Sequence, residues 1–207
     1  LVGQFLSPLT NMRTDDYGGS LLNRTRFARM VMAEMRRRVG SDFIIGLRLQ
    51  MDENSADGLN FDDCVEIVKL LHAEGGLDFI NGVFGRMDTT RALADDNMPG
   101  MHSVSAPFLS VAGKFRKEID LPLFHAARIT DLATARYAIQ EGLLDMVGMT
   151  RGHIADPNIV SKLSRGEEDR IRPCTGASYC LTPQRTCIHN PSIGREATFN
   201  HHIEISE

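Results

Sequence analysis

The sequence predicts an α/β fold in which a parallel β-sheet is covered by helices. Short apolar segments alternate four times with longer segments of helical periodicity along the 207 residues, and this alternation favours parallel strands joined by helices. Periodicity alone leaves two architectures open, part of a (β/α)8 barrel and a doubly wound sheet. No G-x-G-x-x-G pattern follows the first strand, which weakens the second architecture.

The first half of the chain contains two predicted helices and two predicted strands. Ser20 caps a helix that Gly40 terminates, and its apolar residues recur at helical spacing: Phe27, Met30, Val31, Met35 and Val39. A strand over residues 43–49 follows, and a polar loop then leads to a second helix. This helix is closed by Gly75 and Gly76, and its apolar stripe consists of Val65, Val68, Leu71 and His72. The next strand covers residues 79–83.

The second half begins with a long loop over residues 85–105, and a connection of that length is usually functional or mobile. Pro107 is expected in the first turn of the next helix. A strand over 121–126 follows, then a helix that Asp131 caps, and a last strand over 144–148. Asp156 and Pro157 are expected to open a final helix, as a capping carboxylate followed by a first-turn proline.

The composition is that of an ordinary soluble globular protein, with 42% hydrophobic and 24% charged residues. The net charge is −4 and the basic residues are dispersed, which does not favour nucleic acid as a partner. No apolar run reaches the roughly 18 residues of a membrane span, and no signal peptide is visible, so we expect a cytoplasmic protein that does not associate with membranes. The chain starts without Met and is shorter than the about 250 residues of a complete barrel, so we expect it to be part of a longer protein.

Three motifs resemble the old yellow enzyme superfamily. Residues 4–20, with Asn23-Arg24 and Arg26-Phe27, are similar to the signature that follows the fourth barrel strand in that superfamily. Residues 147–151, with Ala155-Asp156-Pro157, match its eighth-strand pattern. Residues 171–174, with Cys180, Cys187 and Asn190-Pro191, resemble the iron–sulfur extension of the larger members. Those members include 2,4-dienoyl-CoA reductase and the trimethylamine and N-methylproline type demethylases.

This resemblance covers essentially the whole chain and implies a particular domain organisation. Residues 1–166 correspond to the C-terminal half of a TIM (β/α)8 barrel, strands five to eight with their helices, which binds FMN. Residues 167–207 correspond to the cysteine-containing extension and the start of a linker. By the same resemblance, an N-terminal half-barrel and a downstream nucleotide-binding domain are missing from this chain.

Arg48 lies inside an apolar strand, where an unpaired guanidinium is costly. A buried salt bridge, or a side chain that reaches solvent, is one interpretation. The resemblance favours another, in which Arg48 is both catalytic and cofactor-binding. Its permanent charge would then lie beside the flavin N1/C2 edge and stabilise the anionic reduced flavin.

The loops after the last two strands are expected to bind the flavin phosphate, as such loops commonly do in these barrels. The candidates are Ala127 and Arg128 after one strand, and Gly148, Thr150 and Arg151 after the other. Family members often have Gly at the position of Ala127. In the loop after the sixth barrel strand, Asp88 or its neighbour Arg86 is the candidate for orienting the substrate, although a solvated loop charge is an equal alternative.

Three of the four cysteines, Cys174, Cys180 and Cys187, crowd into a short segment, which indicates metal ligation in a reducing compartment. The resemblance implies a 4Fe-4S cluster, which four thiolates normally hold. However, Ala177 stands at the second cysteine position. A cluster completed by a water or by His189, a zinc ion held with His189, and no metal at all therefore stay open.

The resemblance implies an FMN-dependent oxidoreductase, and residues 85–88 and 145–157 favour the amine-demethylating branch. Such an enzyme takes a hydride from an N-methyl carbon of a small substrate, and the iminium hydrolyses to formaldehyde. The alternative activity is NAD(P)H-dependent reduction of an activated C=C bond. A third hypothesis is an inactive fragment or scaffold that persists as a homo-oligomer, because half a barrel leaves two sheet edges open. On its own, we expect the chain to bind FMN weakly or not at all.

Overall fold

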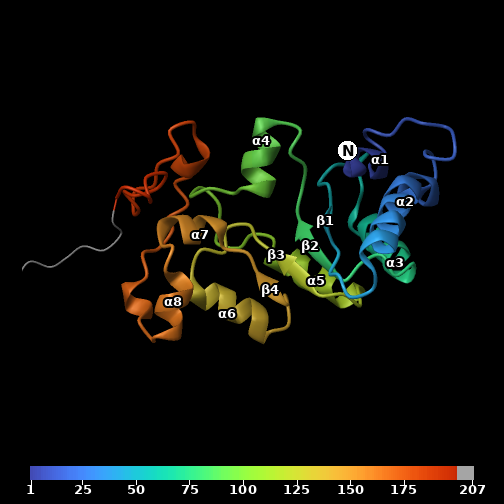
Figure 1. Cartoon of the computed structure of the whole chain (residues 1–207). Helices are drawn as coiled ribbons and strands as arrows, with labels where there is room; N and C mark the ends of the chain where they lie inside the picture. Colours follow the sequence, from blue (N-terminus) through green and yellow to red (C-terminus); the bar gives the residue numbers. More distant parts are fainter. Residues whose placement is uncertain (200–207) are drawn as a thin grey trace, which may run out of the picture.

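A computed structural model describes residues 1–199, so the end of the predicted 167–207 extension lies outside the described residues. A parallel sheet of four strands forms the centre of the protein (Figure 1). Its strands are β1 (Gly46–Gln50), β2 (Phe79–Val83), β3 (Leu123–His125) and β4 (Met146–Val147), and they lie side by side in sequence order.

The strand order identifies the architecture as part of a (β/α)8 barrel. Each strand neighbours the next one along the chain, whereas a doubly wound sheet reverses direction at a switch point. The buried face of the sheet carries Leu49, Ile80 and Leu123, which share one core with helix residues such as Val68 and Phe115. The sheet thus has one helix-covered face and one open face, and the predicted half-barrel is confirmed.

The main helices are α2 (Leu21–Val39), α3 (Phe61–Ala73), α5 (Leu109–Glu118) and α6 (Leu132–Gln140). Three of them start with a local capping interaction. Ser20 Oγ accepts a hydrogen bond from the Asn23 backbone, and Asp131 accepts one from the Thr134 backbone. Asn60 forms a capping box with Asp63 at the start of α3.

Three of the four predicted strands are longer than those observed, whereas β2 covers the predicted residues 79–83. Phe43 and Ile44 precede β1 and are 60% and 70% exposed, because pairing with β2 begins only at Gly46. Similarly, β3 and β4 occupy only the central residues of the predicted 121–126 and 144–148 segments. The apolar runs predicted where the strands lie, but not at which residues the hydrogen bonding between strands begins and ends.

The predicted apolar stripes of two helices are partly wrong. Met30, Met35 and Val39 are 54%, 43% and 41% exposed, whereas the buried residues of α2 are Thr25, Ala28 and Met32. In α3 the stripe is correct except for His72, which is exposed. Helical spacing identified the helices, but the packing partners decide which side of α2 is buried.

The connections contain further short helices. The predicted long loop 85–105 includes α4 (Thr90–Ala92) and the π-helical turn η1 (Leu93–Asn97), and α1 (Val2–Leu6) lies near the N-terminus. Pro107 precedes the N-cap Phe108 of α5, so it does not lie in the first turn. The loop after β4 forms α7 (Thr150–Ala155).

The final helix, α8 (Ile159–Ser164), also differs from its prediction. It starts two residues after Pro157, and Asn158 at its N-cap makes no side-chain capping bond. The predicted cap Asp156 instead accepts a hydrogen bond from the Asn158 backbone in the preceding turn. Two 3-10 turns follow, η2 (Glu168–Arg170) and η3 (Tyr179–Leu181). Within residues 1–199, no helix combines the length and apolar character required to cross a bilayer.

Candidate functional site

The open face of the sheet presents a row of four residues at equal register. Arg48 pairs with Asn81, Asn81 with Phe124, and Phe124 with Met146. Parallel strands point residues of equal register to the same side, and the alternate row, which contains Leu49 and His125, is buried against the helices. Arg48 is therefore on the face that forms the inside of the barrel and not on the outer helical layer.

The Arg48 side chain is exposed on this face, and it makes no ion pair within residues 1–199. Its Nη1 donates a hydrogen bond to Asn81 Oδ1 at 3.2 Å. The structure thus does not support a buried salt bridge at Arg48, whereas the other part of that interpretation, a side chain that reaches solvent, agrees with its exposure in this chain. Asn81 is a residue of this face that the sequence reasoning missed, although a polar side chain in the middle of the apolar strand Phe79–Val83 was a usable signal.

The turn after β3 is strained and carries an unpaired cation. Ala127 and Arg128 have φ angles of 97° and 55°, which non-glycine residues rarely adopt. The φ at Ala127 explains why glycine suits this position. Arg128 Nε and Nη1 are buried and have no hydrogen-bond partner in the described part of the chain. A buried guanidinium with free donors calls for an anion.

Gly148 follows β4 directly beside this turn. Its backbone donates to the His125 carbonyl at 2.8 Å, and a Cβ added at Gly148 would lie 2.9 Å from the Ala126 Cβ. Only a residue without a side chain fits this approach of two strand ends. We call the strained turn with Arg128 and the neighbouring Gly148 the cradle. It lies at the carboxyl end of the sheet, and the two Arg128 donors without a partner in residues 1–199 suit an anion such as the phosphate of FMN.

The two other predicted phosphate ligands lie in the first turn of α7. Thr150 is exposed at the start of α7. Arg151 reaches toward residues 171–192, which we call the cysteine segment, and its Nη1 donates to Ser178 Oγ at 3.2 Å. The structure therefore places Gly148 beside the turn that carries Arg128 and directs Arg151 to the cysteine segment.

The three clustered cysteines line one small cavity of about 20 Å³ together with Arg151 and His189. Burial raises the pKa of the Cys180 thiol, and nearby Cys174 raises it further, whereas Arg151 opposes both effects. Within residues 1–199, no group of three or more His, Cys, Asp or Glu side chains is arranged to hold a metal ion. With Ala177 at the second cysteine position, the thiols as arranged do not fit a four-thiolate cluster.

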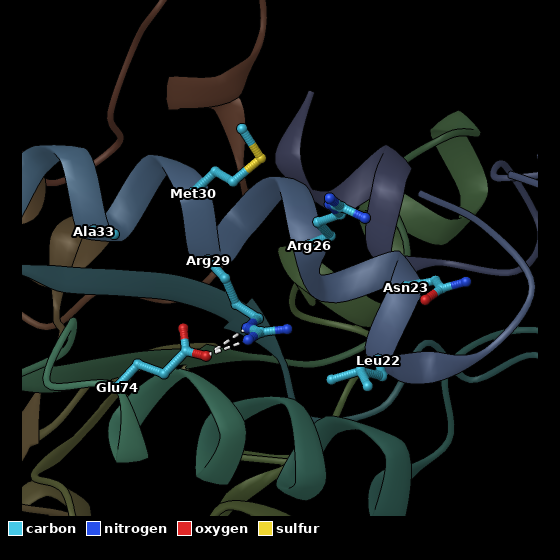
Figure 2. A pocket seen from close by; sticks show the side chains of 7 residues that line it. All are labelled: Leu22, Asn23, Arg26, Arg29, Met30, Ala33 and Glu74. Carbon is cyan, nitrogen blue, oxygen red and sulfur yellow. Dashed lines mark hydrogen bonds and ion pairs between the residues drawn. The ribbon is translucent and has the colours of Figure 1, made fainter. Parts of the chain in front are cut away.

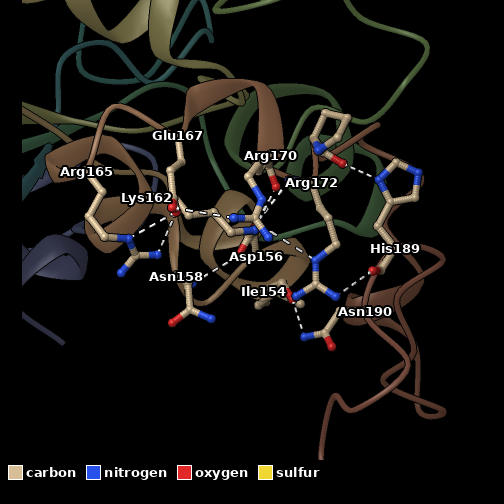
Figure 3. A network of polar contacts seen from close by, with 11 residues as sticks. Ile154, Asp156, Asn158, Lys162, Arg165, Glu167, Arg170, Arg172, His189 and Asn190 are labelled. Carbon is tan, nitrogen blue, oxygen red and sulfur yellow. Dashed lines mark hydrogen bonds and ion pairs between the residues drawn. The ribbon is translucent and has the colours of Figure 1, made fainter. Parts of the chain in front are cut away.

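A buried carboxylate, Asp156, connects α8 to the cysteine segment (Figure 3). Its side chain is fully buried and forms an ion pair with Lys162 at 2.5 Å. It also accepts hydrogen bonds from the backbone of Asn158 at 3.0 Å and of Arg172 at 2.9 Å. Burial by itself would raise the pKa of Asp156, but these bonds outweigh it, and the pKa lies below its usual value.

A second buried polar residue, Asn190, anchors the far end of the cysteine segment. Its Nδ2 donates to the Ile154 carbonyl at 2.7 Å, while its Oδ1 accepts from the Ser192 backbone at 3.1 Å. Arg172 spans the segment and donates to the His189 carbonyl at 3.2 Å. The cysteine segment is thus attached to α7 and α8 by side chains whose anchoring role the sequence motifs did not predict.

The predicted substrate-orienting residue Asp88 lies in the loop between β2 and α4. Its carboxylate is 56% exposed and forms an ion pair with Arg86 at 3.5 Å. Arg86 in turn is held through its carbonyl, which accepts a hydrogen bond from Asn97 Nδ2 at 2.8 Å. Asp88 is therefore accessible at the carboxyl side of the sheet, and its charge is partly compensated by Arg86.

His125, at the end of β3, was not singled out from the sequence. It is 3% exposed, and its Nδ1 lies 2.9 Å from the Gly82 carbonyl oxygen, whereas Nε2 has no partner within residues 1–199. Burial lowers the pKa of His125, the Gly82 carbonyl opposes this effect, and Arg48 lowers the pKa further. The imidazole is therefore neutral in the folded protein at pH 7.

This buried imidazole predicts a pH-dependent stability. Below the unfolded pKa of about 6.5 the unfolded chain binds a proton that folded His125 does not, so the stabilisation present above pH 6.5 is lost as the pH falls toward the folded pKa. We expect the urea midpoint to fall less between pH 7.5 and pH 5 in His125→Gln than in the unmodified protein. The exposed His153→Gln is the control, and an equal fall in all three proteins would contradict the prediction.

A hollow of about 440 Å³ lies on α2, outside the helical layer (Figure 2). It is lined by Leu22, Asn23, Arg26, Arg29, Met30, Ala33 and Glu74, and Arg29 and Glu74 form an ion pair beside it. None of these residues belongs to a strand end, so this hollow is separate from the cradle.

Comparison with known proteins agrees with this geometry. Residues 1–170 match the NADH:flavin oxidoreductase / NADH oxidase family. The chain is 53% identical over 203 residues to the multifunctional alkene reductase/demethylase OYE of Caballeronia cordobensis, and the match covers 98% of this chain and 30% of that protein. It is 45% identical over 208 residues to a probable N-methylproline demethylase of Rhizobium meliloti (strain 1021), with coverages of 98% and 30%.

Two solved structures superpose closely on the chain. A 2-naphthoyl-CoA reductase complex with 2-naphthoyl-CoA gives a TM-score of 0.84 at 29% identity, and it covers 94% of this chain and 30% of the other. Histamine dehydrogenase from Rhizobium sp. 4-9 gives a TM-score of 0.82 at 28% identity, with coverages of 93% and 28%.

This chain belongs to the NADH:flavin oxidoreductase / NADH oxidase family. The resemblance to the old yellow enzyme superfamily that the motifs predicted is thereby confirmed. The chain spans about 30% of the length of the two curated relatives named above. The activity and the substrate of the complete protein are therefore proposed below.

Proposed function

We propose that this chain works within a longer polypeptide, called here the full-length protein, as the phosphate-binding half of an FMN-dependent oxidoreductase. The upstream half-barrel and a downstream nucleotide-binding domain would come from the rest of that polypeptide. The boundary between barrel and extension at residues 166 and 167 belongs to the same proposal. The observation that carries it is the Arg128 guanidinium, whose buried Nε and Nη1 lack partners within residues 1–199.

The residues of the chain have distinct parts in this proposal. Arg128 and Gly148 hold the flavin phosphate, because one supplies free N–H donors and the other lets the anion approach the backbone. Arg48, on the open face, places a permanent positive charge inside the barrel. Asp88, accessible beside Arg86, orients the polar group of a small substrate.

We propose oxidative N-demethylation of a small methylated amine or amino acid as the reaction. FMN, when bound, supplies the two-electron acceptor for a hydride that leaves the N-methyl carbon of the substrate. The resulting iminium then takes up water and releases formaldehyde and the demethylated amine. The names of both curated relatives support this choice, since each contains the word demethylase.

Reduction of an activated C=C bond with NAD(P)H is the second candidate, since the relative from Caballeronia cordobensis is named as an alkene reductase as well as a demethylase. A role as an inactive scaffold or homo-oligomer is the third. It follows from the open face of the sheet, where Met146 is 53% exposed.

Two measurements on the full-length protein separate these candidates. We expect the purified protein to show a flavin absorbance spectrum and to release formaldehyde from a methylated amine such as N-methylproline. Consumption of NADPH with an enone, without formaldehyde release from amines, would favour the second candidate. Absence of any flavin would favour the third.

An iron–sulfur cluster on Cys174, Cys180 and Cys187 remains a separate proposal, to which we assign no step. Three thiolates with a water or His189 would be its ligands. Iron and acid-labile sulfide analysis of the full-length protein decides the question. Zinc without sulfide would instead favour a Cys3His site.

A further inference from the structure

The cysteine segment touches the phosphate cradle at one glycine. Gly176 is buried, has a φ of 75°, and lies against the guanidinium of Arg128. A Cβ added at Gly176 would lie 2.1 Å from Arg128 Nη1 and 3.4 Å from the Met101 backbone nitrogen. The first distance is far below any normal contact, whereas the second is ordinary, so a side chain at Gly176 fits only if the Arg128 guanidinium moves.

Packing, and not hydrogen bonding, confines the Arg128 side chain in this structure. Its Nε and Nη1 are buried without partners in residues 1–199, while its carbonyl is fixed by the Ala106 backbone at 3.1 Å. The backbone of Gly176 is itself held, because its carbonyl accepts from Ser178 Oγ at 3.1 Å. Contact with the Gly176 backbone therefore determines the direction in which the free N–H groups of Arg128 point.

We propose that Gly176 is a positioning residue for the flavin phosphate, which it serves by holding the Arg128 guanidinium in the cradle. This inference rests on the proposed function. It makes the cysteine segment part of the cofactor site, whether or not the segment binds a metal. A methyl group at Gly176 displaces the guanidinium, because the far end of a long side chain moves more easily than the backbone of Gly176.

The test compares the affinities for FMN and for riboflavin, which lacks the phosphate, by flavin fluorescence in the full-length protein after removal of its flavin. We expect Gly176→Ala to raise the Kd for FMN roughly tenfold to a hundredfold, the range that loss of a charged hydrogen bond allows. The Kd for riboflavin should stay within about twofold, since riboflavin has no phosphate for Arg128 to bind.

Gly194→Ala is the matched control, because Gly194 has a φ of 72° and no atom within 4 Å of an added Cβ. It carries the same backbone strain without the contact to Arg128. We expect its two Kd values to equal those of the unmodified protein. Unchanged FMN affinity in Gly176→Ala, or an equal weakening of FMN and riboflavin, would overturn the proposal.

A second comparison applies even if Gly176→Ala does not fold. In an Arg128→Ala background the added methyl group has no guanidinium to displace, so Gly176→Ala should leave the FMN affinity of that variant unchanged. A further large weakening in the double variant would overturn the proposal. If the unmodified protein itself bound no FMN, the proposed function would fail instead, so the two failures are distinguishable.

Discussion

Replacing Arg48 by glutamine in the full-length protein should lower kcat by roughly a hundredfold to a thousandfold, the loss typical of removing one preorganised electrostatic group from an active site. The reduction potential of the bound flavin should fall as well, because in the proposed function the charge of Arg48 stabilises the anionic reduced form. Formaldehyde release from the methylated amine measures the first effect, and redox titration of the flavin spectrum measures the second.

In the 207-residue chain studied alone, the same substitution should change the unfolding free energy little, because there the Arg48 side chain is exposed and its hydrogen bond within residues 1–199 goes to Asn81. Arg38→Gln is a suitable control, since Arg38 is 72% exposed at the end of α2 and forms its ion pair within residues 1–199 with Glu34. A kcat within a few-fold of normal, with an unchanged potential, would show that Arg48 does not act on the flavin.

The second large effect is expected at the buried ion pair of Asp156. Asp156→Ala leaves the Lys162 ammonium, 17% exposed, without its carboxylate, and removes the acceptor of the Arg172 and Asn158 backbone bonds. Breaking a buried pair from one side costs about 3–5 kcal/mol. Urea unfolding should show this loss, and proteolysis should cut the cysteine segment faster.

The exposed ion pair between Arg136 and Glu168 offers the contrast, because its side chains are 46% and 40% exposed. Glu168→Ala should cost less than about 1 kcal/mol. The contribution of Asp156 to the unfolding free energy also depends on pH, because the pKa of Asp156 in the folded protein lies below the unfolded value of about 3.9. It is fully present above that value and is lost as the pH falls through the folded pKa. Equal losses in the two variants would contradict the role of Asp156.

The sequence alone predicted those features that depend on neighbours along the chain. Ser20 and Asp131 are followed by the helices that they were predicted to cap, because a capping bond reaches only three residues ahead. The strand Phe79–Val83 was placed correctly from its apolar run between glycines. The long N-terminal signature led to the family. None of these conclusions needed a contact between distant segments.

The tertiary structure decided everything that depends on distant neighbours. The four strands lie side by side in the same order as in the sequence, and this arrangement distinguished a half-barrel from a doubly wound sheet. Hydrophobic periodicity could not make that distinction. The same packing put Arg48 on the open face, turned Arg151 to the cysteine segment, and left Arg128 Nε and Nη1 without a partner in the described part of the chain. A side chain's burial and partners are set by segments far away in sequence, and the energies that fix them arise only when those segments meet.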